Sequence, residues 1–406
     1  MRGLHGLYPH RNDVVPLAPD MSYSIPFNRP CLAGNEYKYI AQAIANGHAS
    51  GDGPFTRKCH ELLERELGVP RVLLTTSCTH ALEMAALLLD CGPDDEVIVP
   101  SFTFVSTANA FALRGARLVF ADIRPNTLNL DESRLESLIT PKTKAIVVVH
   151  YAGVSCEMDS ICAIAARHGV RVVEDNAHSL FSRHKGTYTG KLSCLATLSF
   201  HETKNFTCGE GGALIINDTE LLERALVIRE KGTNRSRFFR GQVDKYTWVD
   251  LGSSYLPSDL LAAFLYAQLE AREKIQEKRR RVWNRYYASL AGWAGDNDVK
   301  LPSIPPECEQ AYHMFYMLLP SAEHRASLIA QLKAQSILSV FHYTPLHLSE
   351  AGQKFAARQS NCPVTEEVSD RLLRLPFYND LSESDQDRVT SAVTNSRFRL
   401  LSRHAG

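Results

Sequence analysis

Seven short runs of apolar and β-branched residues alternate with amphipathic stretches between residues 71 and 217, and this alternation strongly constrains the fold. Parallel neighbouring strands need long crossover connections, which helices usually supply. The pattern therefore predicts an α/β fold whose mainly parallel, seven-stranded sheet carries helices on both faces. The predicted strands cover residues 71–76, 96–100, 117–123, 144–150, 170–175, 195–201 and 212–217.

The helical segments and breakers extend this prediction to the rest of the chain. Helices are expected over residues 79–89, 106–113, 159–168 and 220–231. Residues 258–293 have few breakers and repeat apolar side chains at three- and four-residue steps, which predicts one long helix. A Pro-rich segment, 301–306, then interrupts the pattern.

These features predict a large domain over residues 25–293 and a smaller C-terminal α/β domain over 294–406. The first 24 residues lack a continuous apolar core and are expected to form a flexible extension. In the smaller domain we expect strands over 312–319 and 339–343 and a helix over 326–335.

Composition excludes several classes of protein. Among 406 residues, 45 basic side chains balance 45 acidic ones, so a nucleic-acid partner is not expected. A membrane span is not expected either, because no apolar run approaches the roughly 20 residues that it requires. The ten cysteines show no close paired spacing, which favours free thiols in a reducing cytoplasm. No metal site is predicted.

The carboxyl ends of the predicted strands carry the residues of chemical interest, since ligands bind at such ends in α/β sheets. A polar turn over residues 75–80 precedes a predicted helix and contains Ser77 and Thr79. Free backbone N–H groups and hydroxyls at a helix N-terminus bind anions, and phosphate is a common one. An ordinary helix cap by either side chain is the alternative.

Two more strand ends carry a carboxylate and a lysine. Asp175 ends one apolar strand, and Ser199 ends another that leads directly to Lys204. A structural aspartate and a surface lysine are the alternatives for these residues taken singly. The glycines of residues 209–212 then allow a sharp turn, but no G-x-G-x-x-G fingerprint is present there. Its absence after the first strand argues against an NAD-dependent oxidoreductase.

Together these residues match what pyridoxal 5′-phosphate (PLP) requires. A lysine must form a Schiff base, a carboxylate must keep the pyridine nitrogen protonated, and an anion cradle must hold the phosphate. Lys204 and Asp175 are predicted to fill the first two roles. An aromatic ring at Phe104 can lie against the cofactor, or else pack in the core. The predicted phosphate ligands are Ser77, Thr79 and Ser199.

Several longer strings carry a family resemblance that covers residues 25–393. They comprise residues 51–53, 101–110, 150–153, 174–178, 199–205 and 209–212. With these motifs the chain resembles the DegT-type sugar aminotransferases of the fold type I PLP enzymes. The resemblance implies a large domain with a mixed, mainly parallel seven-stranded sheet and a smaller C-terminal domain. It also implies a homodimer with active sites at the subunit interface, which transfers the amino group of L-glutamate to a nucleotide-linked keto sugar.

The resemblance gives roles to individual residues. Lys204 bonds to the cofactor, Asp175 contacts the ring nitrogen, and Phe104 stacks on the ring. His178 lies beside the ring on the same turn as Asp175 and joins Lys204 and Asp175 as a catalytic residue. The places beside the phosphate are occupied by Ser199, Thr79 and His80.

Residues 230–236 and 239–248 are further similar to the dTDP-4-amino-4,6-dideoxyhexose transaminases of this family. We therefore expect dTDP-4-dehydro-6-deoxy-D-glucose as the sugar substrate, aminated at C4. A sugar-nucleotide 3-aminotransferase and a PLP-dependent sugar dehydratase are the alternatives, although the dehydratases should lack the lysine. A non-catalytic regulator on the same fold would also tolerate the loss of Lys204. The candidate substrate-binding residues are Arg240, Lys245, Ser254 and Tyr343.

Overall fold

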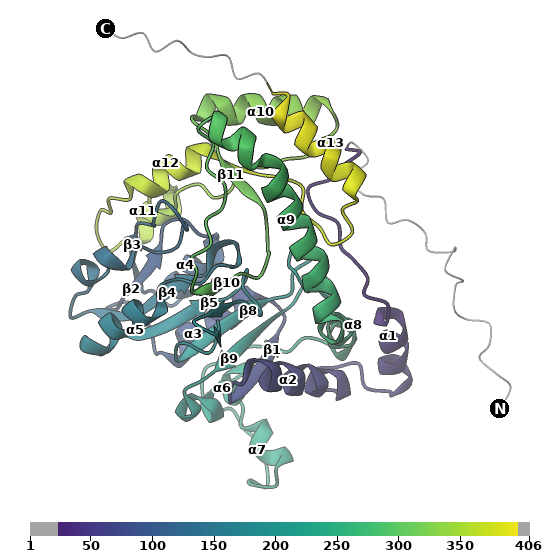
Figure 1. Cartoon of the computed structure of the whole chain (residues 1–406). Coiled ribbons are helices and arrows are strands. Elements are labelled where there is room, and N and C mark those ends of the chain that lie inside the picture. The colour runs from purple at the N-terminus through teal and green to yellow at the C-terminus, as the bar shows by residue number, and fades with distance from the viewer. Residues whose placement is uncertain (1–22, 397–406) are drawn as a thin grey trace, which may run out of the picture.

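A computed structural model describes residues 23–396 and shows the predicted α/β architecture (Figure 1). Its main sheet has seven strands in the order β1-β9-β8-β5-β4-β2-β3, and five of them run parallel to a neighbour. The predicted seven-stranded, mainly parallel sheet is thus confirmed. The predicted N-terminal extension lies outside the described residues, apart from Tyr23 and Ser24.

Each predicted strand of the sheet is present, with ends that differ from the prediction by at most two residues. The apolar runs form strands because their side chains are buried on both faces of the sheet. The seven strands are β1 (Arg71–Thr75), β2 (Glu96–Pro100), β3 (Arg117–Ala121), β4 (Thr143–Val149), β5 (Arg171–Asp175), β8 (Leu195–Ser199) and β9 (Gly212–Ile216).

Strand β9 runs antiparallel to both of its neighbours, β1 and β8. Its first residue, Gly212, therefore pairs with the last residues of those strands, Thr75 and Ser199. This reversal brings the loop between β8 and β9 to the carboxyl edge of the sheet.

Helices cover both faces of the sheet, and alternate side chains of each strand face opposite layers. In β1, Val72 and Leu74 pack with α2 and α8, whereas Leu73 packs with α3 on the other face. The helices around the sheet are α1 (Glu36–Ala45), α2 (Pro54–Leu67), α3 (Cys78–Leu88), α4 (Val105–Ala112), α5 (Met158–Arg167), α6 (Leu222–Arg229) and α8 (Asp259–Glu270).

The single helix predicted over residues 258–293 is wrong in one respect, because α8 ends before Ala271 and α9 (Arg272–Asp296) begins after it. The Ala271 N–H still bonds to the carbonyls of Ala267 and Gln268, at 3.3 and 3.2 Å. The two helices pack in different cores: Leu269 of α8 lies against the sheet, and Tyr286 of α9 lies in a second core. Tertiary packing thus bends the chain where no glycine or proline does, and α9 leads away from the sheet (Figure 1).

The second core joins α9 to the C-terminal part of the described chain. Phe315, Leu332 and Val389 are fully buried in it, and so is Ile25 from the N-terminal side. The predicted domain boundary at residue 293 stays a prediction. The elements beyond α9 are α10 (Ala322–Ala334), α11 (Glu350–Phe355), α12 (Pro363–Arg371), α13 (Glu383–Thr394), β10 (Cys308–Glu309), β11 (Tyr316–Leu318) and β12 (Leu372–Arg374).

The strand predictions in this region need correction. Of residues 312–319 only β11 forms a strand, paired antiparallel with β12. Residues 339–343 do not form a strand: Val340 makes one isolated bridge to Arg374, and the backbone then turns, with Tyr343 at a φ of 25°. No helix in the described range 23–396 is long and apolar enough to cross a membrane.

Candidate active site

A cavity of about 770 Å³ opens at the carboxyl ends of β1, β5 and β8. There the polar residues after these strands meet residues 313–314 just before β11, the segment 340–346, and Arg374 of β12. Most of the site residues predicted from the sequence line this one cavity. They are Ser77, Thr79, Phe104, Asp175, His178, Ser199, Lys204 and Tyr343.

The N-terminus of α3 forms one wall. Ser77 caps the helix, since its Oγ accepts a 3.1 Å hydrogen bond from the His80 N–H. Thr79 Oγ1 lies 2.8 Å from Ser106 Oγ, which also lines the cavity. A Cβ on Gly212 would collide with the backbone of Ser77, so only glycine lets β9 approach this closely. The result is an ordered set of hydroxyls at a helix N-terminus, which suits a phosphate.

His80 does not line the cavity. Its Nδ1 is hydrogen-bonded to Thr76 Oγ1 instead, and its ring packs edge-on against Tyr255. The structure therefore places the His80 side chain behind the cradle, while its N–H belongs to the cap.

Asp175 lies buried at the end of β5 and accepts two hydrogen bonds. Thr107 Oγ1 donates at 2.7 Å to Oδ2, and the Ala177 N–H donates at 3.2 Å to Oδ1. Burial raises the pKa of the Asp175 carboxyl, and the bond from Thr107 opposes that shift. A protonated ring nitrogen beside this carboxylate would supply the positive partner that a buried carboxylate needs.

Lys204 lies in the loop that joins β8 to β9. Its backbone N–H bonds to the His201 carbonyl at 2.9 Å, while no residue of the described chain hydrogen-bonds or ion-pairs with its amine. Burial lowers the pKa of Lys204 to about 8, and Cys78 and Asp175 oppose this shift. An amine with such a pKa is partly neutral near physiological pH and can attack an aldehyde.

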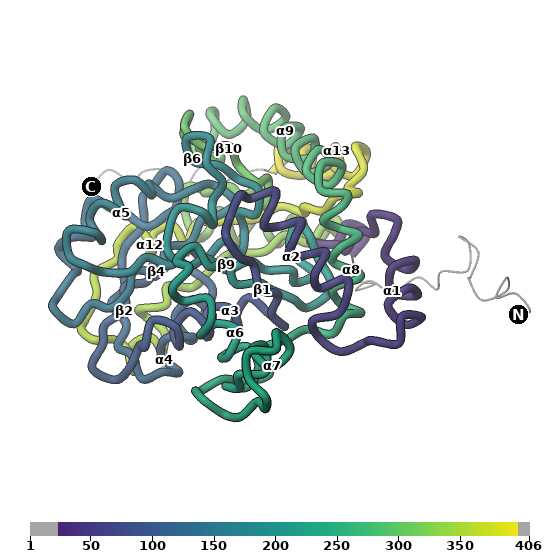
Figure 2. Tube along the Cα trace, turned by 90° about the horizontal axis from the view of Figure 1, so that it is seen from below, coloured from purple at the N-terminus to yellow at the C-terminus, as the bar shows by residue number. Residues whose placement is uncertain are grey.

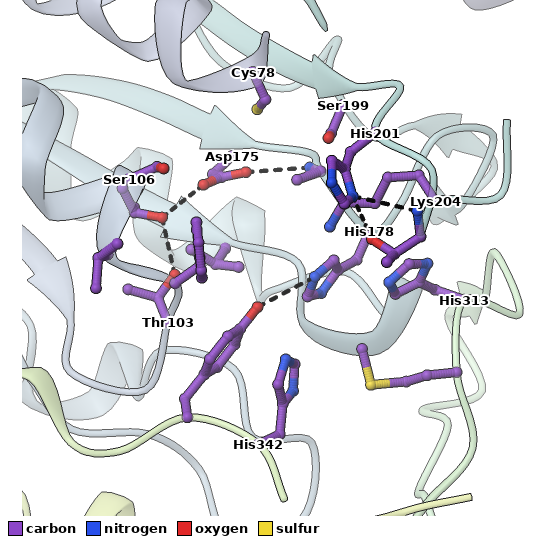
Figure 3. Close-up of a pocket in the computed structure, with 18 of the residues that line it drawn as sticks. Cys78, Thr103, Ser106, Asp175, His178, Ser199, His201, Lys204, His313 and His342 are labelled. Atoms are coloured by element: carbon purple, nitrogen blue, oxygen red, sulfur yellow. Dashed lines mark hydrogen bonds between the residues drawn. The ribbon is translucent and has the colours of Figure 1, made fainter. Parts of the chain in front are cut away.

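Three imidazoles gather on one side of the cavity, and Asp175 and Ser106 lie toward its other side (Figure 3). The His178 ring stacks on His313, with centroids 4.3 Å apart, and Tyr343 Oη lies 3.4 Å from His178 Nε2. Burial lowers the pKa values of His178, His313 and His342 well below the usual value, so these rings are neutral.

His178 Nδ1 is buried and has no hydrogen-bond partner. A buried polar atom without a partner is costly, which indicates that a ligand supplies one. This orphaned nitrogen, the lysine, the carboxylate and the helix N-terminus surround one cavity, and their chemistry fits PLP.

Several residues of the site could not be predicted from the sequence. Thr107 was hidden inside a predicted helix, and no local motif marks His313, His342 or Arg374, which line the cavity from more than 100 residues after Lys204. His342 Nδ1 is held 2.7 Å from Tyr151 Oη. A polar residue inside an otherwise apolar segment is the only sequence signal that these positions offer.

Three predicted substrate residues lie outside this cavity. Arg240 forms a 2.8 Å ion pair with Glu223, Lys245 is exposed, and Ser254 is exposed and forms an isolated antiparallel bridge with Glu230. They belong to the segment of residues 235–254, whose helix α7 (Arg235–Phe239) projects from the body of the molecule (Figure 2).

Comparison with known proteins agrees with this site. The spore coat polysaccharide biosynthesis protein SpsC of Bacillus subtilis is 31% identical over 380 residues, which cover 92% of this chain and 97% of SpsC. The aminotransferase TlmJ from Streptoalloteichus hindustanus superposes with a TM-score of 0.83 at 31% identity, over 91% of this chain and 98% of TlmJ.

A PLP-form structure of the putative sugar aminotransferase Spr1654 from Streptococcus pneumoniae gives a TM-score of 0.84 at 26% identity, over 92% of this chain and 98% of Spr1654. This similarity agrees with the fit of the cavity to PLP, which is the cofactor. The model of the DegT/DnrJ/EryC1/StrS aminotransferase family matches residues 30–394. The chain therefore belongs to the DegT/DnrJ/EryC1/StrS aminotransferase family.

Proposed function

We propose that the protein transfers the amino group of L-glutamate to C4 of dTDP-4-dehydro-6-deoxy-D-glucose and so produces a dTDP-4-amino-4,6-dideoxy sugar. The observation that carries the aminotransferase part is the placement of the Lys204 amine, with its lowered pKa, and the buried Asp175 carboxylate around one cavity. Members of an aminotransferase family need these two groups.

PLP, when bound, supplies an electron-accepting ring that stabilises negative charge on the substrate carbon. Lys204 would hold the cofactor between turnovers and, once released by the donor, would take a proton from the substrate carbon that carries the nitrogen and deliver it to the cofactor carbon bonded to the same nitrogen. Asp175 would keep the ring nitrogen protonated, and Thr107 holds Asp175 in place. Phe104, which lines the cavity, would cover one face of the cofactor ring.

The remaining roles concern position. Ser77, Thr79 and Ser199 bind the phosphate with hydroxyls and helix N–H groups, away from the reacting carbon. His178, whose buried Nδ1 has no hydrogen-bond partner, would contact the cofactor from the wall of the cavity. Burial lowers the pKa values of the three histidines and favours their neutral form, and Lys204 is the group expected to exchange protons.

The sugar assignment rests on residues 230–236 and 239–248, which resemble the dTDP-4-amino-4,6-dideoxygalactose transaminase of enterobacterial common antigen synthesis. The similarity to SpsC, whose name refers to polysaccharide biosynthesis, supports a sugar substrate.

We also propose that the enzyme is a cytoplasmic homodimer whose sites lie at the subunit interface. The segment around α7 exposes large apolar side chains, including Phe239 at 70% and Trp248 at 73% of their surface. Contiguous exposed apolar surface is typical of protein interfaces. In the dimer this segment would bring Arg240, Lys245 and Ser254 toward the sugar nucleotide in the partner's site.

The test is incubation of the PLP-loaded enzyme with dTDP-4-dehydro-6-deoxy-D-glucose and L-glutamate, followed by NMR of the sugar. An amino group at C4 is the expected product. No reaction with this substrate, together with amination of a 3-keto sugar nucleotide, would replace the assignment by that of a 3-aminotransferase. Sedimentation during turnover tests the dimer, and an active monomer would contradict it.

A further inference from the structure

The segment of residues 340–346 lines the cavity and runs from β12 to the core of the main sheet. At its first residue, the Val340 N–H donates to the Arg374 carbonyl at 3.2 Å, and the Val340 carbonyl accepts from the Arg374 N–H at 2.8 Å. At its last residue, Leu346 is buried in the core that α3 and α4 form with the sheet. The segment is therefore fastened at both ends, and its middle forms part of the cavity wall.

Tyr343 lies in the middle of this segment with a backbone φ of 25°. A residue other than glycine is uncommon at a positive φ, and such strain persists only where the surrounding structure fixes it. The Tyr343 side chain lines the cavity, where its Oη lies 3.4 Å from His178 Nε2 and its ring centroid lies 5.5 Å from that of Phe102. The position of Tyr343 thus depends on how the ends of the segment are held.

The end at Leu346 is held by Ser101, the first residue after β2. The Ser101 carbonyl accepts from the Leu346 N–H at 3.0 Å, and its Oγ accepts from the His347 N–H at 3.2 Å. The same Oγ lies 2.7 Å from His347 Nδ1. Ser101 is fully buried, and its own N–H bonds to the Ala121 carbonyl of β3 at 2.9 Å. One serine of the sheet edge therefore binds this end of the segment through three hydrogen bonds.

The hydrogen bonds between these side chains have one direction. Because Ser101 Oγ already accepts from a backbone N–H, His347 Nδ1 is the acceptor that the described residues offer to the hydroxyl proton. The imidazole proton is therefore assigned to Nε2, which lies 3.2 Å from Glu366 Oε1 on α12. None of these three residues lines the cavity. Their hydrogen bonds thus hold the wall from behind.

The groups that would act on the cofactor are held by other contacts. Asp175 is oriented by Thr107, and Lys204 lies in the loop between β8 and β9. Loss of a side-chain contact behind the wall would therefore loosen residues 340–346 and leave the carboxylate and the lysine in place. A sugar nucleotide, with its sugar, diphosphate and base, contacts more of a cavity wall than L-glutamate does. Binding of the sugar nucleotide is therefore the property that such a loss should affect most.

We propose that His347 is a positioning residue, which holds residues 340–346 through Ser101 and so keeps Tyr343 in the cavity wall that binds the sugar nucleotide. The proposal rests on the aminotransferase part of the proposed function. His347 does not line the cavity, so it acts through the segment and exchanges no proton with a substrate. It determines the affinity for the larger substrate rather than the rate of the chemical step.

The test uses two substitutions of His347 that each keep one half of its contacts. His347→Asn places an amide oxygen near the position of Nδ1, where it can accept from Ser101, but it does not reach Glu366. His347→Gln places its amide near the position of Nε2, where it reaches Glu366 and not Ser101. Ser101→Ala removes the hydroxyl itself. His168→Asn and His168→Gln are the controls, because His168 is an exposed histidine that pairs with Glu136 at 3.0 Å outside the cavity.

Single-turnover absorbance, with the enzyme in the aminated form of its cofactor, gives the affinity for dTDP-4-dehydro-6-deoxy-D-glucose and the maximal rate separately. His347→Gln and Ser101→Ala should weaken this affinity about tenfold, which is the effect of one lost hydrogen bond at the upper end of its usual range. The maximal rate, the half-reaction with L-glutamate and the cofactor absorbance should change far less. His347→Asn should recover most of the affinity, and the controls should match the wild type.

Hydrogen–deuterium exchange of the holoenzyme measures the segment without turnover. The backbone amides of residues 340–348 should exchange faster in His347→Gln and Ser101→Ala than in the wild type, and His347→Asn should restore slow exchange. Recovery by His347→Gln instead of His347→Asn, or an equal loss in both half-reactions, would overturn the proposal. Unchanged exchange and affinity in Ser101→Ala would overturn it as well. An enzyme that accepts glutamate but not this keto sugar would contradict only the sugar assignment, because the exchange measurement still tests the segment.

Discussion

Thr107 Oγ1 donates a 2.7 Å hydrogen bond to Asp175 Oδ2, so a hydroxyl from α4 orients the carboxylate at the end of β5. Thr103 Oγ1 lies 2.9 Å from the same hydroxyl and extends the chain of hydrogen bonds across the wall of the cavity. This arrangement keeps Asp175 available as an anion although burial raises its pKa.

Replacement of Thr107 by valine should move the acid limb of kcat to higher pH. The bond from Thr107 lowers the pKa of Asp175, so its removal raises that pKa and protonates the carboxylate earlier as the pH falls. A hydrogen bond to a charged group contributes about 1.5–3 kcal/mol, which corresponds to a displacement of about one pH unit or more. Thr107→Ser, which keeps the hydroxyl, is the control, and an unchanged acid limb in Thr107→Val would contradict the role of this bond.

Lys204→Ala should abolish turnover and the visible absorbance that comes from the bond between lysine and cofactor, because no other amine at that position can form it. Steady-state kinetics and an absorbance spectrum check both effects. Lys185→Ala removes an exposed lysine that pairs with Asp159 and should leave both unchanged. Full activity of the Lys204 variant would refute the assignment of this lysine.

The pH dependence of cofactor binding should reveal the lowered pKa of Lys204. Only a neutral amine attacks the aldehyde, so the rate at which the apoenzyme binds PLP should rise with pH. It should level off above about pH 8, whereas a lysine with the ordinary pKa of 10.5 would make it level off only above that pH. Arg374→Met removes a charge that lowers this pKa, so its midpoint should move to higher pH. Stopped-flow absorbance, with Nα-acetyl-lysine as the free-amine reference, makes the measurement. A rate that follows the free amine would contradict the expectation.

Two glycine substitutions should change stability in opposite directions. A Cβ on Gly53 would collide with the carboxylate of Asp259, which accepts hydrogen bonds from the N–H groups of Phe55 and Thr56 at 3.2 and 2.8 Å. Gly53→Ala should therefore lower the free energy of unfolding by about 1–3 kcal/mol. Gly292→Ala lies in α9 with no atom within 4 Å of the added Cβ and should raise that energy by up to about 1 kcal/mol. Thermal unfolding of matched holoenzymes distinguishes the two, and equal melting temperatures would contradict the packing argument.

The strands of the main sheet could be predicted closely because a strand that is buried on both faces needs a continuous run of apolar residues. The break at Ala271 could not, since the residues around it continue a helical pattern and only their packing against different cores separates α8 from α9. The segment 339–343 has the composition of a strand, but Val340 finds a partner at one position and Tyr343 turns into the cavity.

The residues of the site likewise comprise some that could be predicted from the sequence and some that could not. Ser77, Asp175 and Lys204 follow strands directly, so their meeting at one edge follows from the topology of a parallel sheet. His313 and Arg374 lie next in the chain to Tyr312 and Leu373, which pack in a separate core, and nothing in their local sequence tells which cavity they will face. Arg240 and Lys245 carry a resemblance to sugar-nucleotide enzymes but lie on the projecting segment, where a single chain gives them no contact with the cavity.

The antiparallel direction of β9 has a consequence for how this scaffold changes over evolution. Because β8 and β9 form a hairpin, the connection between them begins and ends at one edge of the sheet. Its second half is tied to the scaffold, since Phe206 and Cys208 are buried with α8 and Asn205 bonds to Gln276 of α9. Exchanges at residues 201–204, which lie outside that core, can therefore alter the reactive amine and its neighbours while the layers of the scaffold keep their packing. A lineage could lose or regain catalysis through substitutions in this one loop, while the rest of the fold stays the same.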